Sequence, residues 1–72
     1  MEIQVGIIKG GKIEVCKLII DGEVVAYSKH SKVIQLYIKY IEGEDMQFPI
    51  GEKAEKVLKP YREKYLRERN LK

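Results

Sequence analysis

The first third of the chain alternates apolar and polar residues with a period of two. Ile3, Val5 and Ile7 fall on one side of the first segment, which is the pattern of a half-buried β-strand. Gly10-Gly11 and Asp21-Gly22 separate this segment from two further apolar segments, and both pairs favour tight hairpin turns because their residues accept positive φ. The pattern predicts a three-stranded meander over residues 2–9, 12–20 and 23–29.

The second of these segments does not keep one phase. Ile13 and Val15 lie on one side, and continued alternation places Lys17 on that side too. A β-bulge near Lys17 would bring Leu18 and Ile20 to the same face, and a bulge also bends and twists its strand. The sequence therefore also allows a partly closed, barrel-like sheet.

Residues 33–42 have two interpretations. Their Val, Ile and Tyr content favours a fourth strand, and a short fifth strand over residues 46–48 would then end at Pro49, which has no N–H for a ladder. As a helix, the segment would gather its polar residues on one arc, with Ser31 at its start and Gly43 at its end. We favour the strand.

Residues 51–70 are predicted to be helical. An apolar stripe with helical spacing runs along them. Its members are Ile50, Ala54, Val57, Leu58, Tyr61 and Tyr65. Pro60 removes one backbone hydrogen bond and is expected to kink the helix.

The predicted fold is therefore α+β, with residues 1–72 as a single domain. A small, twisted antiparallel sheet of four or five strands is covered, on one face or at its open end, by one long, Pro-kinked C-terminal helix. We expect a single buried cluster. Its predicted members are Ile3, Val5, Ile7, Val15, Leu36, Ile38, Val57, Leu58 and Tyr61.

Composition excludes several classes of protein. Cys16 and His30 are the only Cys and the only His, too few for an intramolecular disulfide or a structural zinc site. No apolar stretch approaches the roughly 20 residues that span a bilayer, and the first residues do not resemble a signal peptide. We expect a cytoplasmic protein, and its abundance of Lys and Glu is typical of thermophiles.

No catalytic pattern stands out. Residues 6–12 have the spacing G-x-x-x-x-G-K of a phosphate-binding loop, but Ile13 follows where Ser or Thr should hold magnesium. Ser28 lies close to His30 without an orienting third group. The acidic residues of segment 42–45 supply fewer oxygens than a calcium site needs. The sequence predicts neither an enzyme nor a bound cofactor.

Charge is divided unevenly along the chain. Residues 1–50 carry a net charge of −1 and residues 51–72 a net charge of +4, with all three arginines in the second part. Such asymmetry suggests an anionic partner. The hypothesis favoured by the sequence is a non-enzymatic nucleic-acid-binding module. Its predicted phosphate contacts are Lys64, Arg67 and Arg69, with Tyr37 and Lys39 as secondary contacts on one face of the predicted fourth strand.

The predicted order of elements resembles that of the small archaeal seven-kilodalton DNA-binding proteins, which join a hairpin and a three-stranded sheet to a terminal helix. The resemblance is limited to element order, since this chain lacks tryptophan and is less rich in lysine. The alternative hypothesis is a protein-interaction or self-assembling, homodimeric domain. Short sheets with open edges and tyrosine-rich surfaces favour such association.

Overall fold

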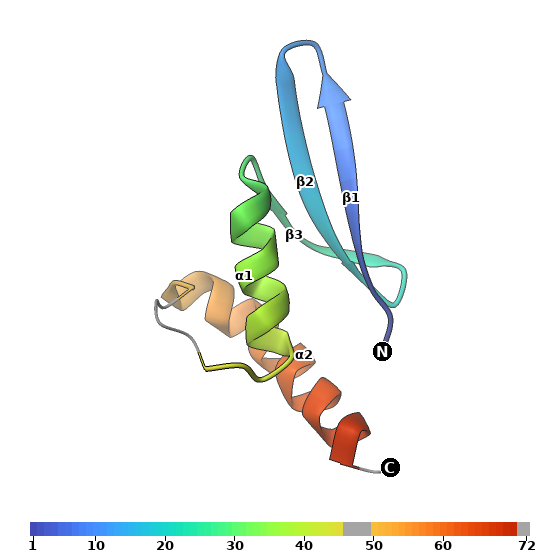
Figure 1. The fold of residues 1–72 in the computed structure, drawn as a ribbon, viewed down its shortest axis with the longest axis vertical. Coiled ribbons are helices and arrows are strands. Elements are labelled where there is room, and N and C mark those ends of the chain that lie inside the picture. Colours follow the sequence, from blue (N-terminus) through green and yellow to red (C-terminus); the bar gives the residue numbers. More distant parts are fainter. Residues whose placement is uncertain (46–49, 71–72) are drawn as a thin grey trace.

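Figure 1 shows the computed structural model of the chain, which describes residues 1–45 and 50–70. Its elements follow the order β1 (Ile3–Gly10), β2 (Ile13–Ile20), β3 (Glu23–Ser28), α1 (Ser31–Ile41) and α2 (Glu52–Asn70). The strands form one antiparallel sheet in the order β1-β2-β3. The α+β class and the long C-terminal helix were predicted correctly. The prediction of four or five strands, or of a barrel, was wrong, because the described residues form an open sheet of three strands.

Both predicted turns of the meander are present. Gly11 has φ of 62°, while Lys12, the other central residue of the first turn, keeps negative φ, as in a type II′ turn. This turn lies one residue later than predicted. Asp21 and Gly22 both have positive φ, 51° and 85°, as in a type I′ turn.

β2 does not contain the bulge expected near Lys17. The extra residue is Val25 of β3, which lies between Ala26, opposite Leu18, and Val24, opposite Ile19. The pairing of β1 with β2 is regular throughout, and the register shifts between Leu18 and Ile19 against β3. Lys17 therefore does not interrupt the strand. It stays on the face opposite the core, where its alkyl chain covers Gly6: a Cβ at Gly6 would lie 2.6 Å from Lys17 Cε.

Residues 33–42 form most of α1, so the predicted fourth strand was wrong. Ile34 and Ile41 are seven residues apart and both fully buried, which shows that a helical period governs the segment. Contact with the sheet outweighs the strand propensity of its Val, Ile and Tyr residues. The predicted fifth strand, residues 46–48, lies outside the described residues.

Gly43 ends α1, as the helical interpretation indicated. The N–H of Gly43 donates to Tyr40 O and that of Glu44 to Lys39 O, both at 3.1 Å, in the pattern of a Schellman motif. Gly43 has φ of 81°, and a Cβ there would lie 2.8 Å from Leu66 of α2. Both the backbone conformation and the close helix contact require glycine.

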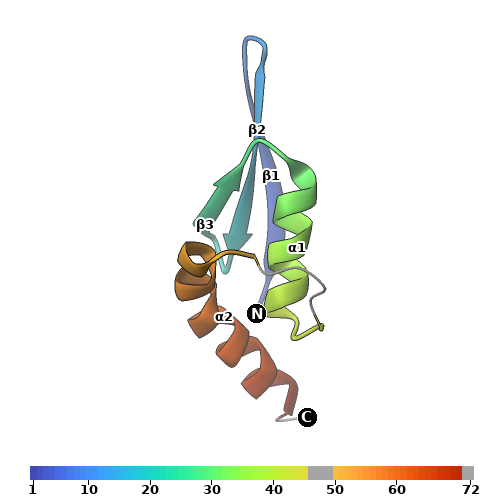
Figure 2. The same ribbon diagram turned by 90° about the vertical axis from the view of Figure 1, so that its left-hand side faces the viewer.

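α1 lies along the sheet, and α2 lies at the end of the sheet opposite the β1–β2 turn (Figures 1 and 2). α1 packs on β2 and β3, and α2 packs mainly on α1. The expectation that the C-terminal helix itself covers the sheet is thus corrected, because α1 occupies that position. Pro60 lies within α2, which is one helix from Glu52 to Asn70.

The core lies between α1, α2 and one face of β2. It consists of Cys16, Leu18, Ile20, Ile34, Tyr40, Ile41 and Leu58. Of the predicted core, Leu58 is buried, and Ile3, Ile38 and Tyr61 pack against the cluster. Val15 and Leu36 are half-buried. Val5, Ile7 and Val57 are exposed, so their predicted burial was wrong.

No helix in residues 1–45 and 50–70 is long and apolar enough to cross a membrane.

Candidate interaction surface

The most exposed apolar surface belongs to the hairpin formed by β1 and β2. The end of this hairpin projects well beyond both helices (Figures 1 and 2). We call residues 5–15 of this hairpin the arm. Projection leaves the arm with sheet faces that no helix covers.

The inner face of β1, which continues the core face of β2, lacks a cover. Val5 lies opposite Leu18 and Ile7 opposite Cys16, and directly opposed residues share one face of a sheet. Leu18 and Cys16 are buried, yet Val5 is 50% and Ile7 56% exposed. The reason is the position of α1, which packs on β2 and β3. The part of the core face that Val5 and Ile7 occupy is therefore open to solvent.

The outer face of the sheet is also apolar. Ile8 and Ile13 of the arm are exposed on it, together with Val24 and Tyr27 of β3. Six of the seven large apolar side chains exposed among the described residues thus lie on the sheet, and Val57 is the seventh. Exposed apolar side chains gathered on one element in this way are typical of a protein-interaction site.

β1 is an edge strand without the usual protection. Proteins blunt exposed edges with proline, bulges, charges or short strands. β1 has eight residues, contains no proline, pairs regularly with β2 and has Lys9 as its one charged residue. Its free edge can therefore accept another strand.

The backbone of β1 presents alternate residues to this edge. The two-residue turn joins Gly10 to Ile13, and the pair that closes such a turn exchanges its hydrogen bonds. Even-numbered residues of β1 therefore bond to β2. The N–H and C=O groups of Ile3, Val5, Ile7 and Lys9 point away from the sheet.

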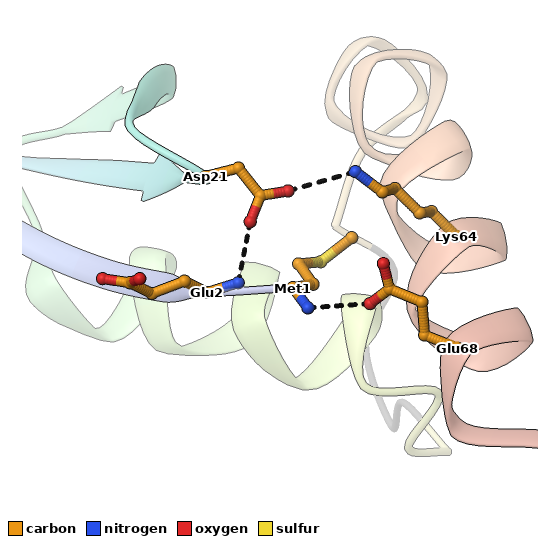
Figure 3. Close-up of polar contacts among 5 residues, drawn as sticks. All are labelled: Met1, Glu2, Asp21, Lys64 and Glu68. Atoms are coloured by element: carbon orange, nitrogen blue, oxygen red, sulfur yellow. Dashed lines mark hydrogen bonds and ion pairs between the residues drawn. The ribbon is translucent and has the colours of Figure 1, made fainter. Parts of the chain in front are cut away.

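Polar contacts hold the base of the hairpin against α2 (Figure 3). The Met1 ammonium lies 2.7 Å from Glu68 Oε2, and Lys64 Nζ lies 3.1 Å from Asp21 Oδ2. The other oxygen of Asp21 accepts the Glu2 N–H at 2.9 Å. This hydrogen bond and the Lys64 ammonium lower the pKa of Asp21, and the same carboxylate raises the pKa of Lys64.

The predicted phosphate contacts lie on α2. Lys64 is held by Asp21, whereas Arg67 and Arg69 are exposed in the last turns of the helix. Arg62, which was not among the predicted contacts, lies with its guanidinium 4.8 Å from the centre of the Tyr40 ring.

The predicted aromatic and basic sheet face does not form. Tyr37 and Lys39 belong to α1, and residues two apart in a helix point about 200° apart. Tyr37 packs against the core and Lys39 is exposed. The structure therefore does not place these two residues on one face, nor on the element that carries Lys64, Arg67 and Arg69.

A shallow cavity of about 250 Å³ lies beside β3, between it, α1 and the start of α2. Tyr27, Tyr37 and Val57 contribute to its lining. This position accounts for the exposure of Val57, which faces the cavity edge rather than the core. The described residues contain no group of three or more metal-ligating side chains.

Sequence reasoning missed the arm as a site. The alternation placed Val5 and Ile7 on the correct face and then assigned them to the core. No local signal in the sequence separates a strand face that a helix covers from one that stays exposed.

Comparison of the chain with protein-family models, with curated proteins and with solved structures found no match.

Proposed function

We propose that the chain is a protein-interaction module that binds a partner through its three-stranded sheet, above all through the β1 edge and the arm. The observation that supports this proposal is the open inner face, where Val5 and Ile7 are about half exposed directly beside buried Leu18 and Cys16. A strand added to β1 would pair its outward backbone groups and cover these side chains. Strand addition of this kind gives affinity through the backbone and specificity through alternate side chains.

Nucleic-acid binding is a second proposal, which rests on the exposed Arg67 and Arg69 at the end of α2. It receives less support from the geometry than the first. The expected strand face of Tyr37 and Lys39 does not form, because both residues lie in α1, and Lys64 already pairs with a carboxylate.

A short fluorescent peptide of alternating threonine and valine tests the first proposal. We expect it to bind with a dissociation constant of about 100 μM or tighter, as in weak, transient interactions. Ile7→Pro should abolish binding, because it removes an outward N–H while leaving the even-numbered residues bonded to β2. The control variant is Ile13→Thr, which removes an equally exposed apolar side chain from β2. Equal anisotropy titrations for the parent and Ile7→Pro would refute strand addition at β1.

Anisotropy of a labelled DNA duplex and a labelled single strand tests the second proposal. Two phosphate contacts predict a slope of log K against log salt of about −2 on duplex DNA. The Arg67→Glu/Arg69→Glu variant should no longer bind DNA. It should bind the threonine–valine peptide as tightly as the parent protein does. Absence of a salt-sensitive signal at low ionic strength would end the nucleic-acid proposal and leave the first one intact.

A further inference from the structure

The β1 edge carries enough information to indicate its occupant. We propose that the strand added to β1 is β1 of a second copy of this chain, antiparallel to the first, so that two sheets of three strands join into one. This inference rests on the proposed interaction function and names its partner. Three features of the edge support it: its backbone pattern, its charges and its apolar side chains.

The backbone pattern selects one register. Outward groups must face outward groups, so Ile3, Val5, Ile7 and Lys9 of one copy must pair with members of the same set in the other. A two-fold axis at Gly6 satisfies this condition along nearly the whole strand. It places Ile3 opposite Lys9 and Val5 opposite Ile7 of the other copy, in both directions. Shifting the axis to Val5 or Ile7 shortens the ladder at one end.

The charges favour the antiparallel orientation. The tip of the arm has an excess of positive charge, with Lys9 and Lys12 against Glu14. The base of the sheet has an excess of negative charge, with Glu2, Asp21 and Glu23 against the Met1 ammonium and Lys64. In the Gly6-centred register, Gly10 of one copy lies opposite Glu2 of the other. Each basic tip then lies beside the other copy's acidic base, whereas parallel strands would bring like charges together.

The apolar side chains supply the contact. On the inner face, Val5 and Ile7 of each copy meet Ile7 and Val5 of the other as cross-strand pairs of β-branched residues, which stabilise antiparallel strands. These are the two side chains that α1 leaves exposed. At the axis itself, two glycines face each other as a non-hydrogen-bonded pair. Neither carries a side chain, and the space above each Gly6 is filled by Lys17 of its own chain.

The arm is accessible to a second copy. In both views the end of the hairpin stands clear of α1 and α2 (Figures 1 and 2). An isologous contact of this type closes after two copies, because it uses the one β1 edge of each chain. The expected assembly is a dimer and not a fibre.

Sedimentation equilibrium across a micromolar to millimolar range tests the assembly. The parent should approach twice the chain mass of 8.4 kDa, and Ile7→Pro should remain at the chain mass while keeping the parent circular dichroism spectrum. Ile13→Thr, whose side chain lies on β2 away from the edge, should still dimerise. Glu2→Lys should weaken the dimer, and adding Lys9→Glu/Lys12→Glu in the same chain should restore it.

Disulfide trapping tests the register. Gly6→Cys, combined with Lys17→Ala to clear the space above Gly6, should cross-link two copies under mild oxidation, since opposed Cα atoms at the axis are about 4.5 Å apart. Lys17→Ala alone controls for Cys16. Gln4→Cys lies on the same face of the same strand, but the two copies of Gln4 would be about 13 Å apart, too far for a disulfide.

The outcomes separate this inference from the proposed function. A parent that stays monomeric throughout, yet binds the threonine–valine peptide at the Ile7 edge, overturns self-pairing and leaves strand addition standing. A monomer that also fails to bind the peptide overturns both. A dimer that Ile7→Pro does not disrupt, or that Gly6→Cys does not cross-link, refutes pairing through β1 in this register.

Discussion

Replacing Leu58 and Val57 separately by alanine tests how α2 meets the core. The two residues are neighbours in the sequence and both belong to the predicted apolar stripe, yet Leu58 is 1% exposed and Val57 51% exposed. Leu58→Ala should cost about 2–5 kcal/mol through lost transfer free energy and a residual cavity. For a chain of 72 residues, total stability is about 4–11 kcal/mol, so this single change removes a large share of it.

Val57→Ala should be nearly neutral. It deletes two carbon atoms that are half solvated already, a loss of about 0.8 kcal/mol. The better helix propensity of alanine returns about 0.5 kcal/mol.

Urea unfolding followed by circular dichroism measures the free energy of unfolding of both variants. Making each substitution in the Ile7→Pro variant removes any contribution from association of two copies. With a slope near 1 kcal/mol per molar urea, Leu58→Ala should lower the midpoint by about 2 M or more. Equal midpoint shifts for the two variants would refute the orientation of α2 described above.

Three further predictions follow from local geometry. Gly43→Ala should cost more than about 1 kcal/mol, because φ of 81° and the 2.8 Å approach of Leu66 both oppose a Cβ; urea unfolding measures it. The pKa of Asp21 is lowered in the folded chain, so this carboxylate adds stability above its usual pKa of 3.8, and that stability is lost as the pH falls through the folded pKa. The pKa of Lys64 is raised, so its ammonium adds stability below its usual pKa of 10.5, and that stability is lost as the pH rises through the folded pKa. Asp21→Asn, which keeps the turn, should thus match the parent's stability in acid and fall below it near neutral pH. Cys16, 5% exposed, should react with a thiol reagent only at the rate at which the chain opens.

Local signals predicted the first half of the fold well. Gly11 and the Asp21-Gly22 pair determine their turns through positive φ, a property of the residues themselves. Period-two alternation likewise placed Ile3, Val5 and Ile7 on the face that continues the core. These features depend on neighbours in the sequence, so the sequence alone was sufficient.

Residues 33–42 show where such signals fail. Their β-branched and aromatic residues favour a strand, and only contact with the sheet makes the helical arrangement of Ile34, Ile38 and Ile41 the better one. The stop at Gly43 was present in the sequence and supported the helix. Strand propensity and the stop at Gly43 predict different structures for this segment, and the structure agrees with the stop at Gly43.

The candidate site could not be predicted because it depends on an absence of cover. Nothing in the residues around Val5 and Ile7 distinguishes a strand face beneath a helix from one that projects past it. The predicted site failed for a related reason. Tyr37 and Lys39 share a face only in a strand, and in α1 they diverge.

Stability and association of this chain should be linked, because the same uncovered face limits one and drives the other. A chain of 72 residues buries little surface alone. Here Val5 and Ile7, on the core face of β1, also remain exposed to solvent. If pairing through β1 supplies the missing cover, each tenfold rise in protein concentration should stabilise the dimer by about 1.4 kcal/mol, or about 0.7 kcal/mol per chain. For a domain of this size that corresponds to a rise in Tm of about 3–5 °C.

Differential scanning calorimetry at a series of concentrations should show this rise for the parent and a constant Tm for Ile7→Pro. A concentration-independent Tm in the parent, at concentrations where it sediments as a dimer, would mean that the dimer forms without stabilising the fold, and the argument from the uncovered face would be wrong.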